Sequence, residues 1–429
     1  MTIRREGDIL RSRWHTRQSG CAPLFHLSPR MPQSHASGPT TSSALVVKTT
    51  VDETTVDPET LDELDVEPSV GTKLSLWAVV FAGGIGTRFW PLSTPQRPKQ
   101  VLALVNERPL LADTIARLSP LVPAERVLVV TSADIADALR RVIPELPEAN
   151  MLIEPRPLGT AAALAWGAQE VARRAGPDTL FCALHADLAA ASPEGFRETL
   201  RSAASVAASS DVLVTIGAAP TRSETGFGYL QPGTPLDPFV SRAEGGACRV
   251  DHFVEKPTAA LADMLIDQGA LWNTGIFVWR AKVVLQELDM HVAEIRQGLP
   301  LLAAGDAETF ASIVTSVSID RGLLERSHNV VVIQGDFGWD DVGTWASLRR
   351  VRELDDTGNG LMGDVHCVDA SGNVVHADET CVVAYGISGM LVVSIRGLTF
   401  VTTLERASEL GPLLNALPGS RRFNPGGLP

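Results

Sequence analysis

The chain has 429 residues, of which 45% are hydrophobic, so it is long enough to form two or three domains with buried cores. Its net charge of −13 argues against a nucleic-acid scaffold, and no apolar run approaches the roughly 18 residues that span a bilayer. Five scattered cysteines without a C-x-x-C pair argue against a disulfide framework and a zinc site, and favour a reducing compartment. We therefore expect a cytoplasmic protein.

Residues 1–72 differ in composition from the rest of the chain. The first 30 residues contain six arginines, and the stretch from Val51 to Pro68 contains eight carboxylates. Neither part has an apolar face that could pack into a core, and no apolar segment typical of a secretory signal is present. We expect residues 1–72 to form a disordered N-terminal extension or a linker.

From Leu76 onward, segments with the pattern of strands alternate with segments with the pattern of helices. The expected strands are Ala78–Phe81, Val127–Thr131, Met151–Glu154, Leu180–Leu184, Asp211–Gly217 and Val330–Ile333. The expected helices are Ala133–Ile143, Thr160–Arg174 and Glu194–Ala208. Repeated β-α units predict an α/β fold, with a Rossmann-like, mixed but mostly parallel sheet flanked by helices. Ligands bind beyond the carboxyl ends of such strands, so motifs at those ends are the candidates for a site.

The most informative motif follows the first expected strand and reads FAGGIGTRFWPLSTPQRPKQ. Gly83, Gly84 and Gly86 lack a Cβ atom, so they can bring backbone N–H groups close to an anion. Arg88 and Lys99 add two positive charges near the same loop. We interpret this combination as a polyphosphate-binding site.

Other interpretations of the loop fit less well. In the dinucleotide fingerprint G-x-G-x-x-G, Phe89 stands where the third glycine belongs, and Pro91, Pro95 and Pro98 interrupt the helix that should follow. A P-loop fails because no G-K-[ST] follows. A glycine turn without a ligand remains the alternative, and the two flanking cations argue against it.

The segment GGIGTRFWPLSTPQRPKQ resembles the signature of the nucleoside-diphosphate-sugar pyrophosphorylases. Its FWPLS and RPKQ portions are most similar to the mannose-1-phosphate guanylyltransferase branch of that family. Further similar segments follow in the expected order as far as Trp345, and a weaker similarity continues to about Leu417. The resemblance implies the nucleotide-diphospho-sugar transferase fold for residues 73–354. It also implies transfer of GMP from GTP to α-D-mannose 1-phosphate, with Mg²⁺ as the cofactor.

The resemblance also implies roles for residues on the nucleotide side of the site. Arg88 and Lys99 are the expected catalytic residues, with Arg88 on the β- and γ-phosphates and Lys99 near the α-phosphate. Asp187 and Asp341 are the expected magnesium ligands, although Leu188 stands where relatives usually have a polar residue. The expected nucleotide-binding residues are Ala82, Gly83, Gly84, Gly86, Thr87, Glu154 and Thr160, the last also as a helix N-cap.

Three later segments, TGFGYL, HFVEKP and WNTGIFVW, resemble the sugar-phosphate-binding segments of the same family. Gly228 is expected to lie against the sugar ring, and Glu255 to accept hydrogen bonds from sugar hydroxyls. Lys256 is expected to face the 1-phosphate and Asn273 a vicinal diol. The alternative for Glu255 and Lys256 is a surface charge pair.

The segment GDFGWDDVGTW crowds three carboxylates, Asp336, Asp340 and Asp341, which repel one another unless a cation or hydrogen bonds compensate. The family pattern W-x-D-x-G assigns the metal-ligand role to Asp341. We expect Asp340 to face solvent or to support the loop.

Beyond Leu354, short β segments separated by Gly, Asn and Asp continue until a helical pattern at Leu404–Leu417. Residues 355–429 are therefore expected to form a small β-rich C-terminal domain with a terminal helix. In similar proteins this region contributes to self-association, which implies a homodimer.

Two other functions remain open. One is the same chemistry with UTP, dTTP or ATP and glucose 1-phosphate, because base choice depends on a few loop contacts. The other is a non-catalytic regulatory subunit that binds a nucleotide sugar. Such subunits lose metal ligands or phosphate-binding cations, and this chain keeps Arg88, Lys99, Asp187 and Asp341. No nucleic-acid or membrane partner is expected.

Overall fold

The structure is a computed structural model that describes residues 75–84, 86–236 and 246–427. The extension expected at residues 1–72 lies outside the described residues. None of the helices in the described part is long and apolar enough to cross a membrane.

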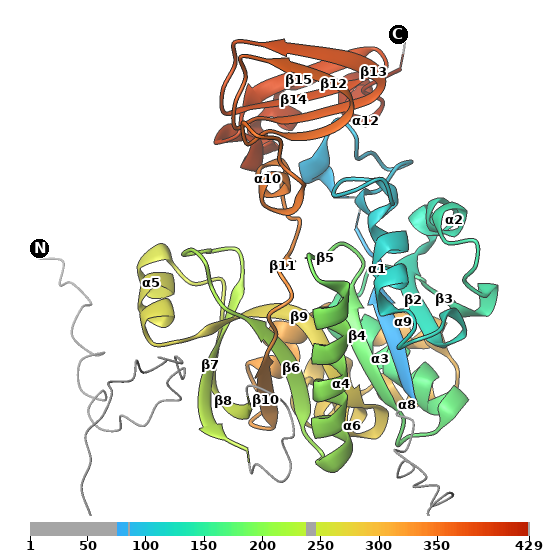
Figure 1. Ribbon diagram of the computed structural model, residues 1–429. Helices are drawn as coiled ribbons and strands as arrows, with labels where there is room; N and C mark the ends of the chain where they lie inside the picture. The colour runs from blue at the N-terminus through green and yellow to red at the C-terminus, as the bar shows by residue number, and fades with distance from the viewer. Residues whose placement is uncertain (1–74, 85, 237–245, 428–429) are drawn as a thin grey trace, which may run out of the picture. The chain divides into compact units, whose positions relative to one another are not determined.

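Among the described residues, a nine-stranded sheet forms the centre of the α/β part (Figure 1). Its strand order is β3-β2-β1-β4-β9-β6-β10-β8-β7, and β8 and β9 run opposite to the other strands. The strands are β1 (Leu76–Phe81), β2 (Val127–Ser132), β3 (Met151–Glu154), β4 (Leu180–His185), β6 (Leu213–Ala218), β7 (Gly228–Pro235), β8 (Ala247–Glu255), β9 (Leu271–Arg280) and β10 (Val330–Gln334). The predicted mixed, mostly parallel sheet is confirmed.

Helices cover both faces of this sheet, as the alternation of side chains along β1 requires. Leu76, Ala78 and Val80 pack into one core with α1, α2 and α4, whereas Trp77 and Val79 pack into a second core with α3 and α6 to α9. The helices are α1 (Leu110–Leu118), α2 (Ala133–Val142), α3 (Thr160–Ala175), α4 (Pro193–Ser209), α5 (Ala259–Asp267), α6 (Ala281–His291), α7 (Ala293–Arg296), α8 (Leu299–Ala303), α9 (Ala307–Ile313) and α10 (Leu348–Val351).

Short helical turns connect several of these elements. They are η1 (Thr87–Phe89), η2 (Lys99–Val101), η3 (Ala124–Arg126), η4 (Glu148–Asn150), η5 (Asp320–Leu324) and η6 (Trp345–Ser347). The turn η5 is a single π-helical turn, a local geometry that is frequent at functional sites.

A second, separate sheet of four strands follows the α/β part. Its order is β12 (Gly360–Val368), β13 (Val374–Tyr385), β14 (Met390–Ile395) and β15 (Leu398–Thr403). The first three strands are parallel although short loops connect them, so the chain coils from one strand to the next. Asn359 and Asn373 stack at equivalent corners of the coil, where the Asn373 amide donates to Asn359 Oδ1 over 2.9 Å.

The four-stranded sheet shares a third core with the loop that follows β1. Phe89, Trp90 and Leu104 pack there with Trp345 and with Val374 and Leu391 of β13 and β14. Arg352 is buried in this region and donates to the carbonyl of Leu104 over 2.7 Å. The division at residues 354 and 355 stays a prediction.

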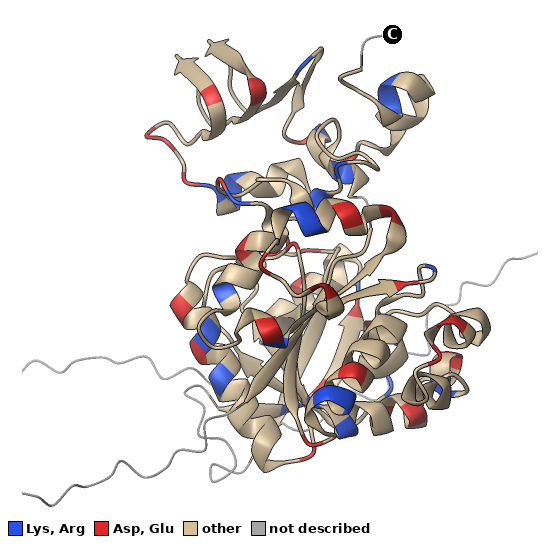
Figure 2. Ribbon diagram, turned by 90° about the vertical axis from the view of Figure 1, so that its right-hand side faces the viewer, with Lys and Arg blue, Asp and Glu red and all other residues tan. Residues whose placement is uncertain are grey.

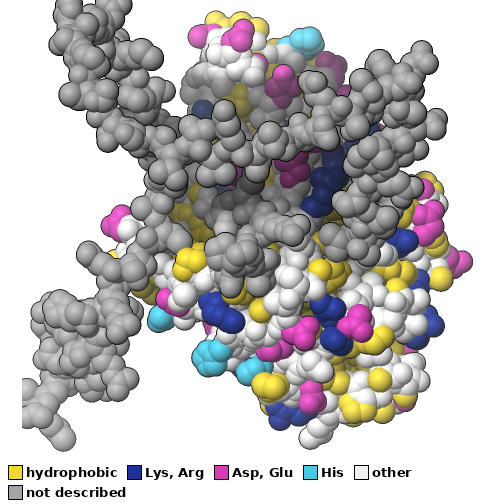
Figure 3. All heavy atoms as spheres, turned by 60° about the horizontal axis from the view of Figure 1, so that its bottom comes forward, with side chains coloured by type: hydrophobic (Ala, Val, Ile, Leu, Met, Phe, Trp, Pro, Cys, Tyr) yellow, Lys and Arg dark blue, Asp and Glu magenta, His cyan; other side chains and the backbone are white. Residues whose placement is uncertain are grey.

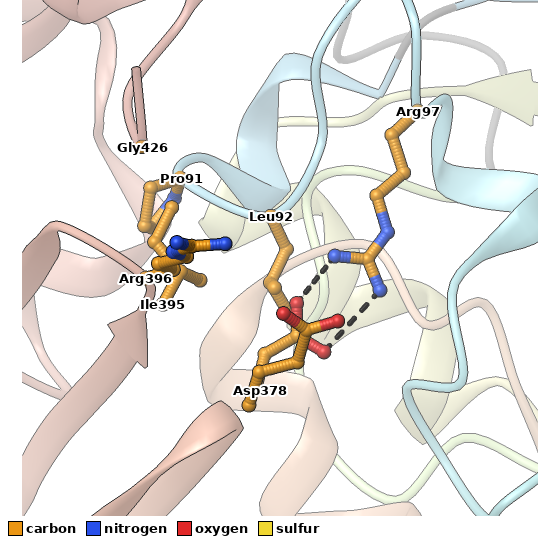
Figure 4. A pocket seen from close by; sticks show the side chains of 8 residues that line it. Pro91, Leu92, Arg97, Asp378, Ile395, Arg396 and Gly426 are labelled. Atoms are coloured by element: carbon orange, nitrogen blue, oxygen red, sulfur yellow. Dashed lines mark hydrogen bonds and ion pairs between the residues drawn. The ribbon is translucent and has the colours of Figure 1, made fainter. Parts of the chain in front are cut away.

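The same junction holds a polar pocket of about 220 Å³ (Figure 4). Arg97 of the loop after β1 reaches across it and forms an ion pair with Asp378 of β13. Arg396 and Pro91 line the opposite side. The pocket thus lies between the signature loop and the four-stranded sheet.

The prediction of a continuous helix at residues 404–417 is wrong. The structure instead has η7 (Arg406–Ser408), α11 (Gly411–Ala416) and a further short helix, α12 (Gly419–Phe423). Pro412 occupies the first turn of α11, where it favours the start of a new helix and cannot continue an earlier one.

Charged residues lie mainly on the helices and loops, and the strands of the central sheet carry few (Figure 2). On the visible part of the face in Figure 3, acidic, basic and apolar side chains intermingle. That part of the surface therefore shows no continuous basic area of the kind that binds nucleic acid.

Candidate active site

The signature loop starts at the carboxyl end of β1. The N–H of Ala82 donates to the carbonyl of Val130, so this residue anchors the loop to β2. Gly83 and Gly84 are exposed beyond it, and the Gln100 amide donates to both of their carbonyls, over 2.7 and 3.1 Å. Because Gln100 holds the carbonyls on one side, it fixes the path of the exposed glycine backbone.

Gly86 meets two constraints that only glycine satisfies. Its φ of +75° is left-handed, and an added Cβ would stand 2.4 Å from Cβ of Lys99. The loop therefore lies directly against Lys99. Thr87 and Arg88 follow on η1, and both are exposed.

Lys99 is buried, and its Nζ lies 2.9 Å from Oδ2 of Asp187. It also lies 5.1 Å from the ring centre of Phe89, within the range of a cation–π contact. Asp187 follows β4, which is the direct neighbour of β1 in the sheet. The parallel pairing of β1 and β4 thus brings the two predicted residues together.

Asp341 reaches the same place through a two-stranded ribbon. Here β5 (Ala189–Ala190) pairs antiparallel with β11 (Trp339–Asp340), and the pair Asp340–Ala189 sets Asp341 beside the segment that follows Asp187. Gly343 makes room for the Asp341 carboxylate, because a Cβ there would stand 2.4 Å from Oδ2. The backbone N–H of Gly343 donates to Oδ1 of Asp341 over 3.2 Å.

The electrostatics of the two carboxylates differ. Burial favours a higher pKa for Asp187, but the charges of Lys99 and His185 outweigh it and hold the pKa below its usual value. Burial and repulsion from Asp340 raise the pKa of Asp341 to about 6, and Asp187 adds to the repulsion. A divalent cation fits this group, because one lysine only partly balances its carboxylates and Mg²⁺ prefers oxygen ligands.

Asp340 supports the loop and does not face solvent. It is buried, accepts from Nε of Arg350 over 2.7 Å and accepts from the N–H of Val342 over 3.1 Å. Leu188, which departs from the family pattern, is buried in the hydrophobic core. An apolar side chain therefore suits this position.

The backbone is strained on both sides of the site. Val342, next to Asp341, has φ of +45°, and Lys256 has φ of +50°. Both values lie in the left-handed region, which is costly for a β-branched residue in particular. Such strain persists where surrounding contacts fix the backbone, and it is concentrated at functional sites.

Among the residues expected to bind the nucleotide, Glu154 ends β3. Burial raises its pKa to about 7, and its buried Oε1 has no hydrogen-bond partner among the described residues. Thr160 is the first residue of α3, and Gly159 is the N-cap instead. The Thr160 hydroxyl accepts from the N–H of Ile319 over 2.8 Å, which ties this helix to the segment before η5.

Among the residues expected to bind the sugar phosphate, Gly228 of β7 and Glu255 of β8 are paired neighbours. A Cβ at Gly228 would stand 2.8 Å from Oε2 of Glu255, so glycine leaves room for this carboxylate. Lys256 Nζ lies 2.5 Å from Oε1 of Glu255. The lysine side chain is 59% exposed, which leaves it accessible to a ligand.

Asn273 is held by bonds within the protein. Its Oδ1 accepts from Thr215 over 3.2 Å and from the N–H of Gly275 over 3.3 Å, and its Nδ2 donates to Asp320 over 2.9 Å. These bonds fix the orientation of the amide, whose second hydrogen can be offered to a ligand.

The structure adds residues that sequence reasoning missed. Asp320 lies near Glu255, His185 and Lys256, and burial together with the Glu255 charge raises its pKa. His185 interacts electrostatically with both Asp187 and Asp320, so it connects an expected metal ligand with the residues expected to bind the sugar phosphate. The position of His185, two residues before Asp187, was a signal in the sequence, whereas only the fold reveals Asp320.

Enzymes that move phosphoryl or nucleotidyl groups need backbone N–H groups and cations for phosphates, beside carboxylates for a divalent metal. The fold and the site therefore define the class of this protein, an α/β enzyme that acts on phosphate-containing substrates. The model of the Nucleotidyl transferase family matches residues 77–357, and the chain belongs to this family.

Relatives in this family are similar over most of the chain. The mannose-1-phosphate guanylyltransferase of Sinorhizobium fredii is 33% identical over 353 residues, which cover 79% of this chain and 67% of that protein. The mannose-1-phosphate guanylyltransferase of Klebsiella pneumoniae is 32% identical over 360 residues, which cover 81% and 75%. The crystal structure of a mannose-1-phosphate geranyltransferase from Thermus thermophilus has a TM-score of 0.72 at 33% identity, and covers 80% of this chain and 98% of that one.

Proposed function

We propose that this chain transfers GMP from GTP to α-D-mannose 1-phosphate and forms GDP-mannose and pyrophosphate. The observation that carries the proposal is the ribbon of β5 and β11. It brings Asp341 beside Asp187, and Asp187 pairs with Lys99 under the glycine loop. Relatives named mannose-1-phosphate guanylyltransferase support the choice of substrates.

In the proposed reaction a phosphate oxygen of the sugar phosphate attacks the α-phosphorus of GTP. The new P–O bond forms as the bond to the β-phosphate breaks, and pyrophosphate leaves with the electron pair. No general base is needed, because a phosphate monoester with a second pKa of about 6 is already ionised at neutral pH. The protein's task is to position two anions and to balance their charge.

The side chains divide this task. Arg88, exposed on η1, faces the β- and γ-phosphates, and Lys99 lies at the α-phosphate. Lys256 attracts the sugar phosphate from the opposite side of the site. Asp187 and Asp341 would hold Mg²⁺, which when bound supplies positive charge against the phosphate oxygens.

Glu154 supports the choice of guanine. Its buried Oε1 is an acceptor without a partner among the described residues. Guanine presents two N–H donors on one edge, at N1 and N2, whereas adenine presents an acceptor at N1. A carboxylate that receives both donors would prefer GTP over ATP.

The test is pyrophosphate release with Mg²⁺ and each of GTP, UTP, dTTP and ATP, offered with mannose 1-phosphate and with glucose 1-phosphate. Turnover confined to GTP and mannose 1-phosphate is the expected result. Asp341→Asn should abolish most of it, because the amide is a weaker metal ligand of nearly the same size. Asp336→Asn is the matched control, since Asp336 is exposed in the same loop.

Other outcomes separate the alternatives. Strong turnover with another pair of substrates would support the proposed mechanism and contradict the assignment of GTP and mannose 1-phosphate as the substrates. Absence of turnover with every pair, in protein that binds GDP-mannose in equilibrium dialysis, would favour a regulatory subunit.

The proposal also includes a cytoplasmic homodimer with no nucleic-acid partner. The net charge of −13 supports the last point. Exposed apolar residues on the four-stranded sheet, Val368, Val383, Tyr385 and Val401, support self-association through residues 355–429. Light scattering measures the molar mass of the unaltered chain and of Tyr385→Ser, and we expect a dimer and a smaller mass, respectively. Identical masses would exclude this sheet from the dimer interface.

A further inference from the structure

The outer half of the β12–β13 pair carries a cluster of three different metal-ligating side chains. Asp364 and His366 are two residues apart on β12, so they lie on the same face of the strand. Cys381 is the direct neighbour of Asp364 on the parallel strand β13. All three residues are exposed.

Their ligand atoms already converge. One imidazole nitrogen, one thiol sulfur and one carboxylate oxygen lie within 4.8 Å of one another. His366 Nε2 is 3.3 Å from Oδ1 of Asp364. The Cys381 thiol is hydrogen-bonded to Asp364, and this contact with a carboxylate raises the pKa of the thiol. The three ligand-bearing groups are therefore already gathered around the Asp364 carboxylate.

We propose that Asp364, His366 and Cys381 form a zinc site, with a water molecule as the fourth ligand. Zn²⁺ accepts nitrogen, sulfur and oxygen ligands and binds three side chains plus water where a site is open to solvent. Ligand atoms around tetrahedral zinc lie roughly 3.5 Å apart, given Zn–ligand distances of about 2.0–2.3 Å. Exposed side chains on paired strands can close to this spacing by rotamer changes alone.

The donor set separates this site from the magnesium ligands of the active site. A thiolate and an imidazole are soft or borderline donors that favour zinc, whereas Asp187 and Asp341 offer oxygen alone and suit magnesium. The sequence argued against zinc because its cysteines are scattered. The site needs only one of them, because the pairing of β12 with β13 supplies the other ligands.

The place of the cluster gives it a structural consequence. β13 pairs with β14 only from Val374 to Ala377, so the half that carries Cys381 has β12 as its paired strand. Glu379, with φ of +55°, lies between these halves, where the register of the β12–β13 pair shifts. Zinc would clamp this two-stranded ribbon at the point where the third strand is no longer paired with it.

The test uses the tag-free full chain, freed of metal and titrated with Co²⁺ as a spectroscopic substitute for Zn²⁺. We expect one equivalent of cobalt with a thiolate-to-metal charge-transfer band, displaced by Zn²⁺ and not by Mg²⁺. Cys381→Ser should remove the band, and His366→Ala should weaken binding at least as much as loss of an outer hydrogen-bond partner does, about 10–100-fold. Cys367→Ser is the matched control, because Cys367 is adjacent on β12 and points to the other face.

Two further measurements make the result decisive. The variant Asp187→Asn with Asp341→Asn should retain the band, because the site uses none of the active-site carboxylates. Zinc should slow hydrogen exchange of the amides at 381–385 in the unaltered chain and not in Cys381→Ser. A band that survives Cys381→Ser, or that disappears in Cys367→Ser, would overturn the site, as would absence of binding.

Discussion

Lys99 Nζ and Asp187 Oδ2 lie 2.9 Å apart, although the two residues follow different strands, β1 and β4. The Lys99 side chain is only 6% exposed, and Gly86 and Phe89 pack against it. The pair therefore joins the glycine loop to Asp187, one of the two proposed metal ligands. Any change at Lys99 therefore alters the charge balance of Asp187 and Asp341 and, in the proposed function, the charge offered to the nucleotide.

Lys99→Ala should lower turnover by roughly 10²–10³-fold, the scale of one lost transition-state donor. The rate of steady-state pyrophosphate release with GTP and mannose 1-phosphate measures the turnover of the variant and of wild type. Arg108→Ala is the control, because Arg108 is an exposed cation a few residues along the same segment and should leave the rate unchanged. A loss under tenfold in Lys99→Ala would remove Lys99 from the catalytic role.

Trp345 links the loop of Asp341 to the signature loop. Its indole N–H donates to the carbonyl of Trp90 over 2.9 Å, and its ring contacts Phe89 with centres 5.2 Å apart. Trp345→Phe leaves the Trp90 carbonyl without this donor, which costs about 1–3 kcal/mol for a buried group. We expect lower kcat with a smaller change in KM, because Phe89 and Lys99 then lose their fixed positions.

Trp279→Phe is the matched control for this change. Trp279 is also fully buried, but it packs in the core on the α3 and α6 side of the sheet and its indole N–H has no hydrogen-bond partner among the described residues. It should lose packing stability in thermal unfolding and keep kcat. Equal effects of the two substitutions on kcat would show that Trp345 acts only through packing.

The sequence indicated the strand ends that form the site, because β1 and β4 are continuous apolar runs that end in polar motifs. It could not indicate how Asp341 reaches Asp187, because β5 and β11 have only two residues each and their pairing is a long-range contact. Asp320 was missed for a similar reason. Its role follows from a bond to Asn273, a residue 47 positions away.

The C-terminal region shows the same limit. Glycine and asparagine spacing predicted short strands, but parallel pairing of β12, β13 and β14 depends on stacked corners such as Asn359 and Asn373. The expected helix over 404–417 failed because the apolar spacing was read through Pro412, which begins a new helix. The apolar spacing over these few turns favours a helix only weakly, whereas proline cannot continue a helix that began before it.

Glu154→Gln tests the buried acceptor of the nucleotide side. The folded pKa of Glu154 is raised from 4.5 to about 7, so the folded state holds the proton more tightly than the unfolded state. Unaltered protein should therefore lose stability as pH rises from about 4.5 to about 7, and Gln should remove that loss. Chemical denaturation of the ligand-free proteins at about pH 5 and about pH 8 should show the variant gaining stability relative to wild type at the higher pH.

The same variant should bind GTP less well. Loss of a charged acceptor of two hydrogen bonds costs about 1.5–3 kcal/mol, which corresponds to a KM for GTP about 10–150-fold higher. Glu145→Gln, at an exposed glutamate, should change neither stability nor KM. A Glu154→Gln variant with unchanged preference for GTP over ATP would exclude Glu154 from base recognition.

His376→Gln tests the buried contact between Arg352 and the four-stranded sheet. Burial and the nearby Arg352 charge lower the pKa of His376 to about 3, and its Nδ1 lies 2.9 Å from Nη2 of Arg352. The unfolded chain binds the proton more tightly, so stability should fall as pH drops from 6.5 toward 3, by at most about 1.4 kcal/mol per pH unit. Glutamine keeps an acceptor for Arg352 without titrating, so the stability of His376→Gln should fall less steeply at low pH than that of wild type. His328→Gln, at an exposed site, should follow the wild-type pH profile. Because Glu154 acts in the opposite direction between pH 4.5 and 6.5, only this difference isolates His376, and superimposable pH profiles would contradict its burial in the neutral form.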